Sequence, residues 1–231
     1  MKGRNPVRQQ EVTDGTQLWI QEVFYTLQGE GPFAGFPSVF VRLGGCNLRC
    51  FWCDTDFESS AWKPSLDELM EKVESERPEF CRLVVITGGE PFRQNLVPFV
   101  KECLARDWQV QVETNGTLWL DELPDDPRIT LVCSPKTPKL HPRMVERLTA
   151  LKYVIKAGEQ DEDDGLPVAS TQVEGATARI YRPQAQHTVY CMPLDEQDPE
   201  RNQANMLACV ETCLKHGYRL TVQGHKTWGV P

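Results

Sequence analysis

The chain has 231 residues, 40% of them hydrophobic, which is enough for one sizeable core but leaves little room for two independent domains. A formal net charge of −8 argues against binding to nucleic-acid phosphates. The sequence shows neither an export signal nor a stretch of the ~20 apolar residues that cross a bilayer. We therefore expect a cytoplasmic protein that binds no nucleic acid and no membrane.

Residues 1–16 are interpreted as a flexible N-terminal arm, followed by a single domain over residues 17–231 that ends in a closing segment.

Within this domain, strand patterns alternate with helical ones. The predicted strands are residues 38–43, 82–87, 108–113, 129–133, 151–156, 187–192 and 218–223. The predicted helices are residues 65–77, which open on a Ser65–Glu68 capping box, 95–106 and 200–216. This order predicts an α/β fold with a mainly parallel sheet, in the form of a partly closed βα barrel.

Nine cysteines in a chain expected to be intracellular argue against a disulfide framework, and an odd number cannot pair completely. Six of them are scattered among apolar residues and are interpreted as small buried side chains. These six are Cys81, Cys103, Cys133, Cys191, Cys209 and Cys213.

The other three cysteines, Cys46, Cys50 and Cys53, lie within eight residues of one another in a loop that starts with two glycines. Three thiolates on a four-iron cluster leave one iron open to a reactive cofactor. Structural zinc normally takes four protein ligands, and His141 is a distant candidate for the fourth. The alternatives are a non-catalytic, zinc-binding interaction protein and three core cysteines that are close by chance.

The C-x3-C-x2-C spacing, with Trp52 before the last cysteine, resembles the radical S-adenosylmethionine (SAM) superfamily, whose fold is a partial, open βα barrel. The resemblance implies a [4Fe–4S] cluster on Cys46, Cys50 and Cys53 whose open iron binds SAM. One-electron reduction then yields a 5′-deoxyadenosyl radical. The resemblance implies no catalytic residue beyond this cofactor.

Polar motifs recur at the ends of several predicted strands, as expected for a ligand site at one rim of a barrel. Residues 87–91, Thr-Gly-Gly-Glu-Pro, resemble the methionine-binding motif of the superfamily, in which Glu90 offers an acceptor to the ammonium group. At Met192-Pro193 the chain departs from the Gln-Pro usual among relatives. The SAM-binding residues implied by the resemblance are Trp52, Cys53, Asp54, Gly89, Glu90, Glu113, Ser134, Pro135, Lys136, Met192, Pro193, Leu194 and Asp195.

Four separated motifs, at residues 24–31, 40–50, 52–55 and 223–226, occur in the order seen in the 7-carboxy-7-deazaguanine synthase family and resemble it. The resemblance runs from about Leu18 to the C-terminus. It implies a carbon–nitrogen lyase that contracts the ring of 6-carboxy-5,6,7,8-tetrahydropterin to 7-carboxy-7-deazaguanine with release of ammonia. This reaction lies on the route to queuosine and other 7-deazapurines.

The same resemblance implies a substrate site closed by the C-terminal tail, with Thr55 binding Mg²⁺. Arg42 lies on an apolar strand, where an unpaired guanidinium is costly, and so it needs an anionic partner. That partner is either the substrate carboxylate or a structural glutamate such as Glu30. The substrate-binding residues implied by the resemblance are Leu27, Gln28, Gly29, Arg42, Thr87, His225 and Pro231.

A glycyl-radical activating enzyme is the nearest alternative, since it shares the cysteine triplet and the Gly-Gly-Glu-Pro motif but acts on a protein partner. It is expected to lack the Leu-Gln-Gly and terminal His-Lys elements that this chain carries. The family further implies a homodimer and a flavodoxin as the electron donor.

Overall fold

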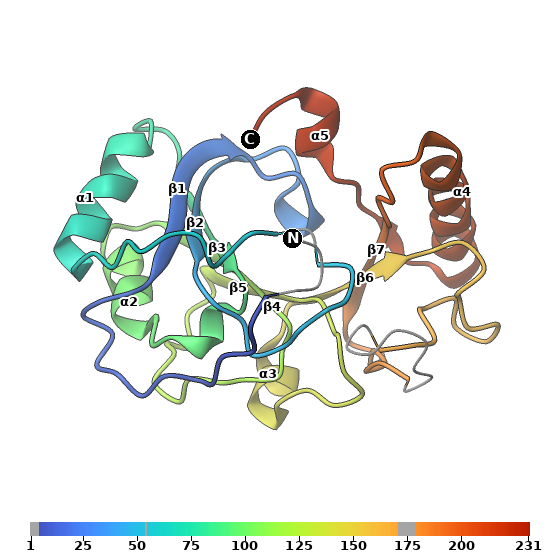
Figure 1. Cartoon of the computed structure of the whole chain (residues 1–231), viewed down its shortest axis with the longest axis horizontal. Helices are drawn as coiled ribbons and strands as arrows, with labels where there is room; N and C mark the ends of the chain where they lie inside the picture. The colour runs from blue at the N-terminus through green and yellow to red at the C-terminus, as the bar shows by residue number, and fades with distance from the viewer. Residues whose placement is uncertain (1–4, 54, 171–178) are drawn as a thin grey trace.

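The computed structural model describes residues 5–53, 55–170 and 179–231, and it contains one eight-stranded sheet within these residues (Figure 1). The strands are β1 Ile20–Leu27, β2 Pro37–Leu43, β3 Leu83–Gly88, β4 Gln109–Thr114, β5 Ile129–Cys133, β6 Ala150–Ile155, β7 Thr188–Pro193 and β8 Arg219–Leu220. The α-helices are α1 Leu66–Glu76, α2 Val97–Ala105, α3 Pro142–Arg147, α4 Pro199–His216 and α5 Gly224–Trp228. Two short 3-10 helices, Gly31–Phe33 and Pro91–Arg93, follow β1 and β3.

The strands are ordered in the sheet as they occur in the chain, from β1 at one edge to β8 at the other. β1 is antiparallel to β2, whereas every later pair is parallel. The two edge strands do not pair with each other, so the curved sheet does not close into a barrel. This confirms the predicted α/β fold with an open, partial barrel.

Alternation along the strands gives the sheet two different faces. Val41 of β2 and Val112 of β4 belong to a hydrophobic core shared with the helices, which surround the sheet in Figure 1. The next residue on each strand, Arg42 and Glu113, faces the concave side. Because the side chains of a strand alternate between faces, each strand packs one set of residues against the helices and lines an inner cavity with the other set.

Helix ends follow the local sequence closely. The predicted capping box is present at α1, where the Ser65 hydroxyl accepts from the backbone N–H of Glu68 and the Glu68 carboxylate accepts from that of Ser65. Asp198 caps the start of α4, and Gly217 ends it in the left-handed conformation with φ of 73°. No helix in the described residues is long and apolar enough to cross a membrane.

Two parts of the sheet differ from the sequence prediction. β1 was not predicted as a strand, because the polar Gln21 and Glu22 follow its first residue and its pairing with β2 shifts register between Ile20 and Glu22. The strand predicted over residues 218–223 is reduced to Arg219 and Leu220. It stops there because the Gly224 N–H bonds to the carbonyl groups of Val222 and Gly29, which turns the chain toward α5.

Of the flexible arm predicted over residues 1–16, the structure describes residues 5–16, and several of these are hydrogen-bonded to the domain. The Arg8 N–H donates to the carbonyl of Cys46 at 2.8 Å, and the Glu11 N–H donates to that of Arg93 at 2.7 Å. The sequence pattern missed these contacts because they satisfy backbone groups and carry no periodicity. The first part of this segment, residues 5–11, therefore packs along the loop that carries the cysteine triplet.

Candidate active site

The concave face of the sheet holds a cavity of about 1180 Å³. This exceeds the ~300–1,000 Å³ of a typical small-molecule pocket. Among the sequence-predicted site residues that the structure describes, Glu90 alone does not line it, and Asp54 lies outside the described residues. The predicted residues that do line it are Leu27, Gln28, Gly29, Arg42, Cys46, Cys50, Trp52, Cys53, Thr55, Thr87, Gly89, Glu113, Ser134, Pro135, Lys136, Met192, Pro193, Leu194, Asp195, His225 and Pro231.

All three cysteines of the triplet line this cavity, and none of them is part of a disulfide. Cys46 is buried, and burial raises the pKa of its thiol to about 12, whereas Cys50 and Cys53 are partly exposed. Soft thiolates are the ligands of iron–sulfur clusters, so this donor set fits a [4Fe–4S] cluster. In the described parts of the chain, no three His, Cys, Asp or Glu side chains gather closely enough to hold a single metal ion.

His141, considered above as a distant fourth zinc ligand, has another role. Its Nδ1 accepts a hydrogen bond from the backbone N–H of Arg143 at 3.2 Å and caps α3. The ring stacks on Trp119 and does not line the cavity. The proposed zinc contact from His141 is therefore wrong.

Lys136, after β5, places a positive charge near the cysteine loop. Its Nζ donates to the Ser134 hydroxyl at 2.7 Å and lies 5.1 Å from the centre of the Trp52 ring. Burial lowers the pKa of Lys136, while the electrostatic influence of Cys50 opposes this shift. A cation in this position is suited to an anionic group bound beside the triplet.

Glu90 is fully buried and does not line the cavity, and the direct cofactor contact expected of it stays a prediction. Its carboxylate accepts hydrogen bonds from the Thr114 hydroxyl and the Asn115 N–H, both at 2.7 Å, and from the Phe92 N–H at 3.1 Å. Glu90 thus ties the loop after β3 to the loop after β4. Its neighbour Gly89 does line the cavity.

The free energy of unfolding should depend on pH through Glu90. Burial raises its pKa from 4.5 to about 7 in the folded protein. The folded state therefore binds this proton more tightly, and the stabilisation present below pH 4.5 is lost as the pH rises through about 7. Glu90→Gln should flatten this part of the profile, measured as urea midpoints from pH 4 to 8. Glu122→Gln, at an exposed position, is the control. A pH profile for Glu90→Gln as steep as that of this control would show that Glu90 is not the titrating group.

Glu113 lies at the centre of a polar cluster on the inner face of β4. One carboxylate oxygen accepts from the side-chain amides of Gln28 and Gln111, both at 3.1 Å, and the other accepts from the Thr87 hydroxyl at 3.1 Å. The sequence analysis placed Glu113 with the SAM contacts, but these bonds group it with Gln28 and Thr87, which were predicted to bind substrate.

Arg42 has an anionic partner, as its strand position required, but that partner is not Glu30. Its Nε donates to the Glu22 carboxylate at 2.6 Å, and its guanidinium lies 5.9 Å from the centre of the Phe24 ring. Glu22 and Arg42 face each other directly in the β1–β2 register. The Arg42 side chain is about one-fifth exposed and lines the cavity, so it remains accessible from there.

Glu30 instead forms an ion pair with Lys152 of β6, and the sequence analysis missed this lysine. Both side chains are nearly buried, with exposed fractions of 13% and 11%. Lys152 stands between the core residues Leu151 and Tyr153, so the argument applied to Arg42 would have singled it out. The pair joins the loop after β1 to the opposite side of the cavity.

Breaking this pair from one side should destabilise the protein strongly. Lys152→Met leaves the Glu30 carboxylate buried without its partner, which we expect to cost about 3–5 kcal/mol in the free energy of unfolding. The double variant with Glu30→Gln should recover much of this loss, measured by urea unfolding. Lys101→Met, at an exposed pair with Glu122, is the control. Additive losses in the double variant would show that the pair does not act as a unit.

The C-terminal segment packs over the end of β1 (Figure 1). The Thr26 hydroxyl donates to an oxygen of Pro231 at 2.9 Å. Burial lowers the pKa of His225, whose ring lies directly above Gly29. Lys226 forms an ion pair with Asp195, which follows β7, and this pair lowers the pKa of Asp195 to about 2. The tail thereby links the two sides of the cavity.

Comparisons with known proteins agree with this geometry. The sequence model of the radical SAM superfamily matches residues 40–155. A 7-carboxy-7-deazaguanine synthase from Rhodospirillum rubrum is 57% identical over 98% of both chains. An enzyme of the same name from Rickettsia prowazekii is 36% identical over 100% of this chain and 96% of its own.

The fold has a matching solved structure as well. The crystal structure of QueE from Escherichia coli superimposes with a TM-score of 0.66 at 25% identity, covering 90% of this chain and 95% of that one. Two sequence relatives above 30% identity cover nearly the whole chain, and the superfamily match spans the cysteine triplet and most of the sheet. The chain belongs to the 7-carboxy-7-deazaguanine synthase family of radical SAM enzymes.

Proposed function

We propose that the protein contracts the ring of 6-carboxy-5,6,7,8-tetrahydropterin to 7-carboxy-7-deazaguanine with loss of ammonia. The observation that carries this proposal is one continuous cavity, which is lined both by the three cysteines of the triplet and by a set of hydrogen-bonding groups. Its relatives are named for the same product.

Cys46, Cys50 and Cys53 hold the [4Fe–4S] cluster in this proposal. When bound, the cluster and SAM supply a carbon radical that can remove a hydrogen atom from the substrate. Thr55, which lines the cavity beyond Cys53, is the proposed Mg²⁺ ligand. A hard cation with few protein ligands suits a substrate that carries a carboxylate.

The proposed SAM site lies beside the cysteine loop. Gly89 offers backbone groups, since its lack of a side chain allows close approach, and Lys136 offers a cation for the carboxylate of the cofactor. Glu90 positions these loops from behind by bonding to Thr114 and Asn115. The remaining proposed contacts are Trp52, Cys53, Asp54, Ser134, Pro135, Met192, Pro193, Leu194 and Asp195.

The proposed pterin site uses the polar cluster around Glu113. Its carboxylate can accept from the amino and ring N–H groups of a pterin edge, while Gln28 and Thr87 hold it in place. Arg42 offers its guanidinium to the substrate carboxylate, and Glu22 keeps that guanidinium oriented. Leu27 and Gly29 supply backbone groups, and His225 and Pro231 close the site and exclude water.

The oligomeric state, the location and the electron donor are proposed from the family to which the chain belongs. We propose that residues 17–231 form a single domain, joined by the packed N-terminal segment, and that the protein works as a cytoplasmic homodimer. A flavodoxin is the proposed electron donor.

The deciding experiment is anaerobic turnover of 6-carboxytetrahydropterin by the iron-reconstituted protein with SAM, Mg²⁺ and a reductant, followed by mass spectrometry. Formation of 7-carboxy-7-deazaguanine is the expected result. Cleavage of SAM to 5′-deoxyadenosine without this product would reject the pterin substrate. A full cluster without any cleavage of SAM would reject the radical reaction.

A further inference from the structure

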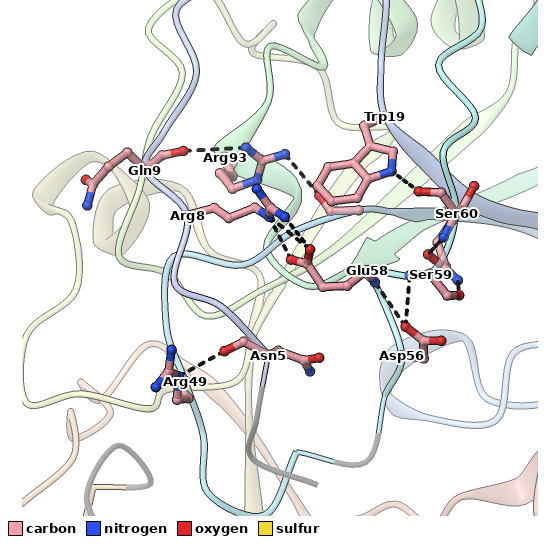
Figure 2. Close-up of polar contacts among 12 residues, drawn as sticks. Asn5, Arg8, Gln9, Trp19, Arg49, Asp56, Glu58, Ser59, Ser60 and Arg93 are labelled. Atoms are coloured by element: carbon pink, nitrogen blue, oxygen red, sulfur yellow. Dashed lines mark hydrogen bonds and ion pairs between the residues drawn. The ribbon is translucent and has the colours of Figure 1, made fainter. Parts of the chain in front are cut away.

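Residues 5–11, here called the N-terminal strap, run along the loop that carries the cysteine triplet (Figure 2). Val7 forms a parallel bridge with Cys46, and the Arg8 N–H donates to the Cys46 carbonyl at 2.8 Å. One cysteine of the triplet is therefore bonded through its own backbone to a segment 38 residues earlier in the chain.

The strap also bonds to the middle and the far end of this loop. The Asn5 carbonyl accepts from Arg49 Nε at 2.9 Å, and the Asn5 side-chain amide donates to the Thr55 carbonyl at 3.3 Å. The Arg8 guanidinium binds both oxygens of the Glu58 carboxylate, with distances of 2.6 to 3.0 Å. The strap thus contacts the loop at its start, between its cysteines and after them.

Beneath the strap, the Arg8 side chain stacks on the Trp19 ring, which also contacts Arg93. Its guanidinium lies 4.9 Å from the centre of the Trp19 ring, and that of Arg93 lies 5.7 Å from the same ring. Arg93 is 2% exposed and bonds to the Glu11 carboxylate at 2.7 Å and to the Gly44 carbonyl at 3.1 Å. Figure 2 shows Arg8, Arg93 and Trp19 together. The strap therefore contacts the buried Arg93 side chain and the half-buried Trp19 ring as well as the loop.

The two glycines before Cys46 are needed for this packing. A Cβ on Gly44 would lie 2.4 Å from the Trp19 ring, and one on Gly45 would lie 2.7 Å from Arg93 Nε and 2.9 Å from Arg8 Cδ. Real Cβ contacts are not this short, and Gly45 also has a positive φ of 77°. The cysteine loop can therefore pack this closely against Trp19, Arg93 and the strap only with glycine at both positions.

We propose that the strap is a working part of the cysteine loop and that Arg8 is a positioning residue for the cluster ligands. Arg8→Ala keeps the backbone bond to Cys46 but removes the Glu58 clamp and the contact with Trp19. Residues 44–58 then open more often, and the thiolates are exposed to competing ligands. This inference rests on the cluster of the proposed function.

The test compares iron-reconstituted wild type with Arg8→Ala, Arg8→Lys and Glu58→Gln. Arg82→Ala is the matched control, since Arg82 forms an exposed pair with Asp107 next to the N-terminal end of β3, away from the loop. Three quantities are measured: anaerobic iron release to a chelator, hydrogen exchange of residues 44–58, and the unfolding temperature.

We expect Arg8→Ala and Glu58→Gln to release iron about fivefold faster and to exchange faster within residues 44–58, with unfolding temperatures like that of the control. Arg8→Lys should be intermediate, because an ammonium keeps the charge but loses the two-point contact. Iron release and loop exchange equal to those of Arg82→Ala would overturn the proposal. Faster exchange over the whole chain would overturn it too, since the role would then be general stability.

Two further outcomes are decisive. If Arg8→Ala does not fold, Glu58→Gln applies the same criterion from the other side of the pair. If the wild type binds no cluster, the proposed function fails, whereas hydrogen exchange of residues 44–58 in the full chain still decides whether the strap holds the loop.

Discussion

Replacing Cys50 by alanine is expected to abolish both iron–sulfur absorbance and formation of 7-carboxy-7-deazaguanine, while the fold persists. Cys50 is partly exposed on the cavity wall, so its thiol contributes little to the core. Two thiolates leave the cluster with too few protein ligands, and without a held cluster SAM has no iron to bind. The measurements are absorbance after anaerobic reconstitution, product by mass spectrometry and far-ultraviolet circular dichroism.

Cys103→Ala is the matched control for Cys50→Ala. Cys103 is fully buried on α2 and belongs to the hydrophobic core. Its replacement should cost about 1 kcal/mol of stability through the small cavity it creates, yet the cluster and turnover should remain. Product formation by Cys50→Ala, or equal loss of iron from both variants, would contradict the assignment of the triplet.

Gly29→Ala is expected to lower kcat/KM by about 100-fold, because misplacing a group by ~1 Å can have an effect of this size. The added Cβ would lie 2.7 Å from Nδ1 of His225 and 3.0 Å from its backbone nitrogen, so a side-chain rotation alone cannot relieve the clash. Helix α5 must then move, and the bond from the Gly224 N–H to the Gly29 carbonyl is strained. Because His225 of α5 is proposed to close the substrate site, steady-state kinetics should show a raised KM.

Gly35→Ala in the same loop is the control for this prediction. A Cβ there meets no atom within 4 Å, although its φ of 87° makes the substitution strained. The expected cost is about 1–2 kcal/mol of stability with KM unchanged. Equal kinetic effects from the two variants would show that loop strain, and not displacement of α5, is the cause.

Much of the site was predictable because its chemistry is local. The three cysteines, the Thr-Gly-Gly motif and the Ser-Pro-Lys motif each lie within a few residues, and the ends of neighbouring strands in a parallel sheet meet at one edge. Their convergence on one cavity needed only the order of the strands. The placement of Glu90 did not follow in the same way, because its three donors come from its own turn and from the next strand end.

The partner of Arg42 illustrates the limit of sequence analysis. The need for an anionic partner followed from its place on an apolar strand. The choice of Glu22 over Glu30 depended on the antiparallel register of β1 and β2, and β1 was itself not recognised as a strand. Lys152 then became the partner of Glu30, although 122 residues separate the two.

By itself, the amino-acid sequence determined the alternating α/β fold, the cysteine triplet and the resemblance to a radical SAM family, since these depend on spacing and periodicity along the chain. Only the tertiary structure decided which charges pair, that Glu113 belongs with Gln28 and Thr87, and that residues 5–11 pack against the cysteine loop. The physical reason is that such contacts join residues far apart in the chain. Their energies depend on register, burial and distance, which no local pattern contains.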